Sequence, residues 1–273
     1  MEYVIFIIIL CYLCSSAVYM AYLFFQKNYL HKAGYYLMLA GLLCHSLAIG
    51  YRFAQTGHFP VNNLYETLML SGWAIAVVFI LFQYKFNLRI LGVYAAPLAA
   101  LVTIAAYLVP NEPVEMNYIL NSMWIVFHVI VILIGEASFA LACGLGILYL
   151  MQEHAIKTKS HGFLFRRLPS LDLLDSAGYA CLIAGFIMLS LGLISGLVYA
   201  KSVWGRFWGW DPKEVWSAIT WLFYAALLHE RLTVGWRGRK SAVMAIIGFA
   251  VLLFTFLGVN FLLEGHHGAF TSM

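Results

Sequence analysis

The residues from Trp204 to Trp216, WGRFWGWDPKEVW, combine flat aromatic side chains with glycines. Four tryptophans fall within these 13 residues, and Gly205 and Gly209 lie between the first three of them. Glycine lacks a side chain and lets a flat molecule approach the backbone, and aromatic faces stack on a planar π-system. The stretch indicates either a platform for a flat ligand or an ordinary aromatic anchor at a membrane interface.

The end of this stretch also fits the start of a helix. Asp211, Pro212 and Glu214 have the residue types favoured at the N-cap and at the first and third helical positions. Helix capping therefore explains Asp211 and Pro212 without a ligand. The residues that we assign to an aromatic platform are Trp204, Phe207, Trp208 and Trp210, with Asp211 at its end.

The composition places this stretch in a membrane protein. Of the 273 residues, 63% are hydrophobic and 10% are charged, whereas a soluble domain has roughly a quarter charged residues. Apolar runs of about 20 residues recur and are typical of membrane-spanning helices. We predict an all-α polytopic protein, with one membrane domain over residues 1–273 and about eight spans, at residues 3–25, 33–53, 65–84, 91–109, 121–151, 179–200, 213–230 and 242–263.

The distribution of positive charge predicts the orientation of these spans. Placing alternate loops inside puts 12 of the 16 Lys and Arg residues in the cytoplasm. Both termini and residues 201–216 then face outward. Glu2 and the lack of a basic residue before the first apolar run favour a permanent span over a cleaved signal peptide. The net charge of +4 reflects the inner-loop bias and gives no reason to propose a nucleic-acid partner.

Histidines occur at the same predicted membrane face as the tryptophans. His128 lies about two turns below the outer end of the fifth predicted span, and His266 and His267 follow the outer end of the eighth. Imidazole is a common axial ligand of haem iron. A flat ligand between two imidazoles therefore indicates haem, with ordinary interfacial histidines as the alternative interpretation.

Two other histidines fall inside predicted spans. His229 lies near the inner end of the seventh span beside Glu230 and Arg231, where a histidine that reaches the interface is one interpretation. His45 lies in the middle of the second span, and a hydrogen bond to a neighbouring helix is its simplest role. All five cysteines also fall inside predicted spans, where we expect them to act as small apolar side chains.

Three segments of the sequence resemble those of a known family. WGRFWGWDPKEVWSAITW resembles the tryptophan-rich WWD signature of haem-handling membrane proteins. GHFPVNNLYETL and FLGVNFLLEGHHGAF are similar to segments of the CcsA (ResC-like) proteins of System II cytochrome c biogenesis. The resemblance runs from about residue 40 to the C-terminus. It implies an external WWD haem-binding segment at residues 201–216, haem b as the bound substrate, and a location in the bacterial plasma membrane or, as the alternative, the plastid thylakoid.

The resemblance also implies roles for individual histidines. His128 resembles the first of two external haem ligands in the family, and His267 resembles the second. His266 directly precedes His267, so the choice within this doublet stays open. His229 resembles an intramembrane haem ligand, which the family pairs with a histidine of a second protein. We add His45 as a candidate substitute for that partner residue.

The implied activity is that of a cytochrome c haem lyase (holocytochrome c synthase) subunit. Such a subunit carries haem to the external face and presents it for thioether attachment to the CXXCH motif of apocytochrome c. The resemblance implies a CcsB (ResB-like) membrane partner and thiol-reducing thioredoxin-like proteins. One alternative is a haem exporter or chaperone that does not attach haem, and another is a structural subunit without a ligand.

Overall fold

The computed structural model describes residues 2–110, 122–159 and 162–259, which are almost entirely helical and contain no strand. This confirms the predicted all-α class. The elements are α1 (Glu2–Phe25), α2 (Asn28–Thr56), α3 (Leu64–Phe86), the 3-10 turn η1 (Arg89–Leu91), α4 (Gly92–Leu108), α5 (Met123–Lys157), α6 (Phe163–Arg167), α7 (Leu171–Trp204), α8 (Pro212–Thr233), α9 (Arg239–Leu253) and the π-helical turn η3 (Phe254–Gly258).

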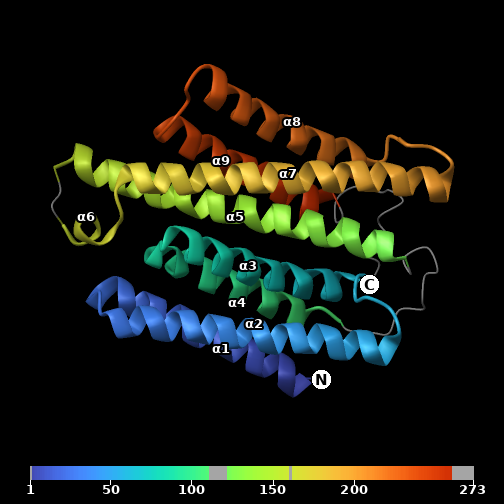
Figure 1. Cartoon of the computed structure of the whole chain (residues 1–273), viewed down its shortest axis with the longest axis horizontal. Helices are drawn as coiled ribbons and strands as arrows, with labels where there is room; N and C mark the ends of the chain where they lie inside the picture. The colour runs from blue at the N-terminus through green and yellow to red at the C-terminus, as the bar shows by residue number, and fades with distance from the viewer. Residues whose placement is uncertain (1, 111–121, 160–161, 260–273) are drawn as a thin grey trace.

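The long helices lie side by side along one direction (Figure 1). The α1–α2 pair forms one side of the molecule, α3 and α4 follow, then α5 and α7, and α8 with α9 forms the other side. The connections α1–α2, α3–α4, α5–α7 and α8–α9 lie at one end, and the connections α2–α3 and α7–α8 lie at the other. This is the alternation predicted from charge, and we call the first end inner and the second outer.

Seven of the described helical segments are long and apolar enough to cross a membrane, which confirms a polytopic membrane protein. The seventh predicted span, 213–230, forms α8 but is not among these seven segments. Its first turn carries Lys213 and Glu214, and its last turns carry Glu230 and Arg231, which shortens the apolar stretch between them. Residues 152–178, between the fifth and sixth predicted spans, are largely helical, because α5 continues to Lys157 and α7 begins at Leu171.

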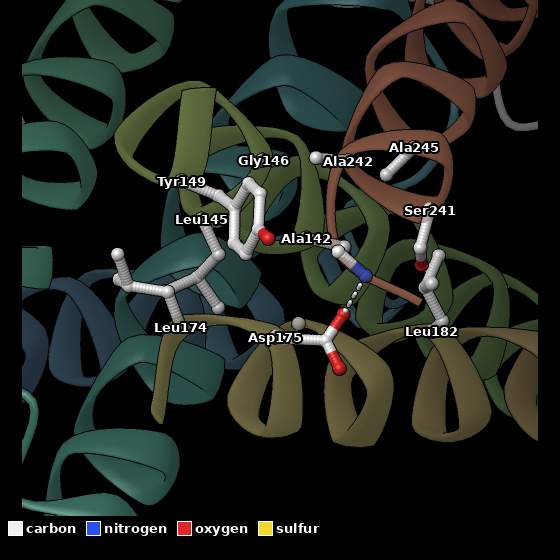
Figure 2. Close-up of a pocket in the computed structure, with 12 residues that line it drawn as sticks. Ala142, Leu145, Gly146, Tyr149, Leu174, Asp175, Leu182, Ser241, Ala242 and Ala245 are labelled. Carbon is white, nitrogen blue, oxygen red and sulfur yellow. Dashed lines mark hydrogen bonds between the residues drawn. The ribbon is translucent and has the colours of Figure 1, made fainter. Parts of the chain in front are cut away.

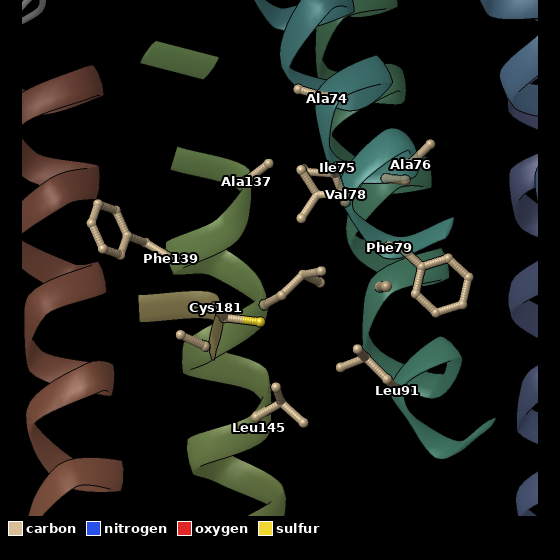
Figure 3. Close-up of a cluster of buried hydrophobic side chains, with 14 of the residues drawn as sticks. Ala74, Ile75, Ala76, Val78, Phe79, Leu91, Ala137, Phe139, Leu145 and Cys181 are labelled. Atoms are coloured by element: carbon tan, nitrogen blue, oxygen red, sulfur yellow. The ribbon is translucent and has the colours of Figure 1, made fainter. Parts of the chain in front are cut away.

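The core lies where α5 packs between α3 and α7. Figure 3 shows Val78 of α3 facing α5, and Phe139 of α5 extending on the other side. Phe79 points away from α5 and packs against Tyr19 of α1. Cys181 of α7 is fully buried in the same cluster. All five cysteines are free thiols, and Cys143 and Cys181 are buried. They fill space between helices, as predicted for cysteines within spans.

An ion pair joins three helices at the inner end. Arg231 of α8 donates to both carboxylate oxygens of Asp175 of α7, at 2.9 and 2.6 Å, and to the Ser241 hydroxyl of α9 at 3.0 Å. The backbone N–H of Gly238 also donates to Asp175, at 2.8 Å. The Arg231 side chain is 6% exposed. The pair therefore fixes α8 and α9 against α7 from within.

Replacement of Arg231 by Met is expected to destabilise the protein by about 3 kcal/mol, because it leaves a largely buried carboxylate without its charged partner. The matched control is Lys157→Met, which breaks a pair with Glu153 in which the Lys157 side chain is 61% exposed. That change should cost less than about 0.5 kcal/mol. Thermal unfolding in detergent, followed by circular dichroism, measures both. Equal shifts in Tm would show that the inner pair contributes no more than an exposed one.

Candidate functional site

The WWD segment connects the outer ends of α7 and α8 through a short turn. Gly205 follows the last residue of α7 with a φ of 73°, and its N–H bonds to the carbonyl of Lys201. A residue with a side chain would be strained there, which explains the glycine. The Lys201 ammonium donates to the Gly205 carbonyl at 2.8 Å and lies over the Phe207 ring. Lys201 thus holds the turn together.

The start of α8 is capped as predicted. The Asp211 carboxylate accepts from the backbone N–H of Lys213 at 2.9 Å, and Asp211 and Glu214 form a capping box with Pro212 at the helix start. Glu214 extends this role, because its carboxylate also accepts from the N–H of Gly209 at 2.7 Å. The capping residues therefore also fix the backbone of the turn that carries the tryptophans.

The platform residues differ in how far they are exposed. The exposed fractions of Trp204, Phe207 and Trp210 are 43%, 56% and 78%. Trp208 is half-buried and meets Trp210 edge to face, with ring centroids 5.9 Å apart. Trp210 has a φ of 58°, an unusual conformation for a residue with a side chain. Such strain persists only where the surroundings enforce it, and here the α8 cap does so.

The fourth tryptophan of the stretch does not belong to the platform. Trp216 lies in α8 and packs edge-on against Phe254, with ring centroids 4.5 Å apart. Its backbone carbonyl accepts from the Thr220 hydroxyl at 2.9 Å, and Thr220 is hydrogen-bonded to Thr255. Trp216 therefore helps to join α8 to the last described turn.

His128 lies on α5 against the outer half of α7. Its Nδ1 lies 2.9 Å from the carbonyl oxygen of Gly192 and 3.1 Å from the hydroxyl of Ser195. A carbonyl only accepts, so Nδ1 carries the proton and Nε2 carries the lone pair of the ring. His128 is packed beside Gly196, about 12 Å along α7 from Trp204 at a helical rise of about 1.5 Å per residue. Its depth agrees with the prediction from topology.

The two other histidines predicted within spans, His45 and His229, lie far apart. His45 is fully buried on α2, where its Nδ1 lies 3.2 Å from the Tyr12 hydroxyl. His229 is exposed on α8. Because α2 and α8 lie on opposite sides of the molecule (Figure 1), the structure does not bring His45 and His229 together. His266 and His267 lie outside the described residues.

The segment GHFPVNNLYETL forms an outer turn fixed by an ion pair that sequence reasoning missed. Asn63 caps α3 by accepting from the N–H of Glu66 at 2.8 Å, as predicted. The Glu66 carboxylate also accepts from Arg52 of α2 at 2.7 Å and from the N–H of Asn62 at 2.8 Å. In the sequence, Arg52 stands out only as a basic residue on the predicted outer side, and nothing near it indicates Glu66 as its partner.

Three basic residues at this turn, Lys201, Arg206 and Lys213, interact with other parts of the chain. Lys201 holds the turn, as described, and Lys213 interacts electrostatically with Glu136 of α5 and with Asp211. A Cβ added at Gly209 would lie 3.0 Å from the Arg206 guanidinium, so Arg206 packs on that glycine. These contacts tie the WWD segment to its own backbone and to α5.

A small pocket lies at the inner end, away from the WWD segment. Figure 2 shows it between α5, α7 and α9, with Tyr149, Asp175 and Ser241 on its wall. Its cavity volume is about 20 Å³, far below the roughly 300–1,000 Å³ of ordinary ligand sites. None of the residues predicted to bind haem lines it.

Comparison with known proteins identifies the family. The family model described as "Cytochrome C assembly protein" matches residues 61–267. The chain belongs to this family. It is 36% identical over 245 residues to the cytochrome c biogenesis protein CcsA of Prochlorococcus marinus (strain MIT 9301), covering 81% of this chain and 79% of that protein. The predicted resemblance to CcsA proteins is thereby confirmed.

A second CcsA protein and a solved structure are also similar to this chain. The CcsA protein of Guillardia theta is 33% identical over 253 residues, covering 86% of this chain and 84% of that protein. Among solved structures, the cytochrome c haem lyase CcmF superimposes with a TM-score of 0.64 at 15% identity. The match covers 99% of this chain and 48% of that one, and at this identity it shows a shared fold. Membership of the family supports a role in cytochrome c maturation.

Proposed function

We propose that this cytochrome c assembly protein presents haem b at the external membrane face for covalent attachment to apocytochrome c. In this role it is a subunit of a System II holocytochrome c synthase. The observation that carries the proposal is the placement of His128. Its Nδ1–H donates to the Gly192 carbonyl on the outer half of α7, which leads directly to the exposed aromatic platform.

The residues present fit a haem. Histidines that bind metals commonly donate their other ring N–H to a backbone carbonyl or carboxylate, which fixes the tautomer and the ring orientation. His128 has this arrangement, with Nε2 as the iron-binding atom. The exposed faces of Trp204, Phe207 and Trp210 offer stacking area for a porphyrin. His267, or its neighbour His266, supplies the second axial ligand in this proposal.

The chemistry requires positioning more than acid–base catalysis. Each cysteine thiol of the CXXCH motif adds across one vinyl group of the haem. The sulfur bonds to one vinyl carbon and the hydrogen goes to the other, so no electrons are gained or lost overall. The protein needs to hold the haem and orient its vinyl edge toward the thiols. The thiols must be reduced, which accounts for thiol-reducing thioredoxin-like partners.

His229 supports a second, intramembrane haem position. It belongs to an exposed face of α8 whose residues recur at helical spacing: Ile219, Leu222, Ala226, His229 and Thr233. A polar side chain directed toward lipid is costly and tends to be functional. We infer that a CcsB (ResB-like) partner covers this face and contributes the ligand opposite His229. Haem then enters from the inner side and moves outward to His128.

The second candidate function is a haem exporter or chaperone that delivers haem without attaching it. The exposed aromatic platform fits this function too, because delivery also requires that haem be held at the outer end. Both functions place the chain in a membrane. We propose the bacterial plasma membrane, with the thylakoid as the alternative, since its relatives include both cyanobacterial and algal proteins.

Co-expression with an apocytochrome c separates the two functions. With the CcsB-like partner present, we expect covalent haem on the cytochrome, detected by haem staining after denaturing electrophoresis. The control is an apocytochrome whose two CXXCH cysteines are changed to serine, which has no thiols to add to the vinyl groups. Haem that reaches the external side without any thioether product, in the presence of the partner, would contradict the synthase and support the exporter.

A further inference from the structure

The packing of α5 against α7 follows a regular antiparallel register. Three glycines of α7 each receive a side chain of α5: a Cβ added at Gly185 would collide with Phe139, one at Gly192 with Ile132, and one at Gly196 with His128. Each pair of residue numbers has the same sum, as expected for two antiparallel helices in fixed register. His128 is therefore the outermost of three side chains that fit against glycines, and its ring occupies the space that the missing side chain of Gly196 leaves.

The polar contacts of His128 come from the same turn of α7. Ser195 donates its hydroxyl to the Gly192 carbonyl at 2.8 Å and lies 3.1 Å from Nδ1 of His128. Because this hydroxyl proton is already engaged, its oxygen accepts from the imidazole, as the Gly192 carbonyl does. The backbone carbonyl of Ser195 in turn accepts from the indole N–H of Trp124 at 2.8 Å. Trp124 and His128, one helical turn apart on α5, are therefore both hydrogen-bonded to the same turn of α7.

We propose that Ser195 and Gly196 are positioning residues for haem binding. Ser195, together with the Gly192 carbonyl, holds the proton on Nδ1 of His128, and Gly196 sets the plane and depth of the ring. Nε2 is thereby kept as the iron-binding atom at a defined place below the platform. This inference rests on the proposed role of His128 as a haem ligand. It assigns functions to α7 residues that lie 67 and 68 positions away in the sequence.

The geometry predicts different effects for the two residues. A Cβ at Gly196 would lie 2.8 Å from Cε1 of His128, closer than such atoms approach in folded proteins, so the ring must move. Gly196→Ala should therefore weaken hemin binding about 100-fold, toward the upper end of the range for residues that orient metal ligands. Ser195→Ala removes one of two acceptors and leaves the Gly192 carbonyl, so about tenfold is expected.

The test is a hemin titration of the purified full-length chain, with absorption and electron paramagnetic resonance spectra of each variant. The matched control is Gly178→Ala on the same helix, where the added Cβ would meet only Leu145, at an ordinary 3.8 Å. We expect Gly178→Ala to bind hemin as wild type does, and Gly196→Ala to bind weakly with altered low-spin signals. Equal behaviour of Gly196→Ala and Gly178→Ala would overturn the proposal.

A double-variant cycle separates positioning from general damage to the fold. If Gly196 acts through the ring of His128, adding Gly196→Ala to His128→Ala causes no further loss of hemin affinity. A further loss of similar size in that background would refute positioning. His128→Ala that binds hemin as tightly as wild type would instead refute the proposed function, so the two failures are distinguishable.

The tautomer has a readout that needs no haem. In the haem-free protein with ¹⁵N-labelled histidine, the signals lost in His128→Ala belong to that ring. We expect them to show a proton on Nδ1 in wild type and in Gly178→Ala, and a smaller share of this tautomer in Ser195→Ala, where only the Gly192 carbonyl still accepts. A proton on Nε2 in wild type, or an unchanged tautomer in Ser195→Ala, would contradict the role given to Ser195.

Discussion

Replacement of His128 by Ala is expected to lower the haem content of the purified protein more than about tenfold. The change removes the proposed axial ligand, whose orientation is already set by the hydrogen bond from Nδ1 to the Gly192 carbonyl. Bis-imidazole haem is low-spin, so the remaining haem should lose that spectrum. Absorption spectra and a pyridine haemochrome assay measure both effects in protein purified with its CcsB-like partner.

The matched control for this prediction is His154→Ala, which removes an exposed histidine at the inner end of the same helix. It should retain wild-type haem. The same measurement on His266→Ala and His267→Ala identifies the second ligand, because only one of these changes should reproduce the loss. If replacing His128, His266 or His267 leaves the haem content unchanged, the axial ligands lie elsewhere. His229 and His45 are then the next residues to replace.

Removal of the three exposed platform aromatics together, Trp204, Phe207 and Trp210 to Ala, is expected to weaken hemin binding by roughly 100-fold. Each aromatic contact with a flat π-system contributes about 1 kcal/mol, and three contacts correspond to about 3 kcal/mol if they add. Thioether formation should fall as well, because a haem held only by its iron can rotate about that axis. Hemin titration and haem staining of a co-expressed cytochrome measure the two effects.

A matched triple variant controls for the loss of exposed aromatic surface. Phe25, Tyr29 and Tyr84 lie near the inner end and are 65%, 67% and 88% exposed. Their replacement by Ala removes similar rings from the other membrane face and should leave hemin affinity unchanged. Were the two triple variants to lose affinity equally, the tryptophans would be interfacial anchors, as the alternative interpretation of the sequence holds.

Local features of the fold could be predicted because they depend on residues close together in the chain. A helix cap involves positions within about four residues of one another, and the caps at Asn63 and Asp211 occur where the sequence indicates them. Apolar runs likewise identified the membrane class. The same pattern does not identify α8 as a clear span, because charged residues in its first and last turns make it less apolar than the other long helices.

The division of the tryptophans could not be predicted in this way. Four of them lie within 13 residues, yet Trp216 faces Phe254 while Trp210 is 78% exposed. The two residues differ in exposure because α8 begins at Pro212, so that Trp216 lies within the helix and packs against Phe254, whereas Trp210 lies in the turn before it. The positive φ of Trp210 is also a consequence of packing, since no residue with a side chain prefers it.

By itself, the sequence determined the helical membrane class, because composition, spacing and charge bias carry that information. It also named the candidate haem-binding residues, whose outer position stays a prediction. Only the tertiary structure decided which atoms surround them. His128 receives its hydrogen-bond partners from residues 64 and 67 positions away, and its ring space from Gly196. Such contacts depend on the register of two packed helices, and no local pattern around His128 specifies that register.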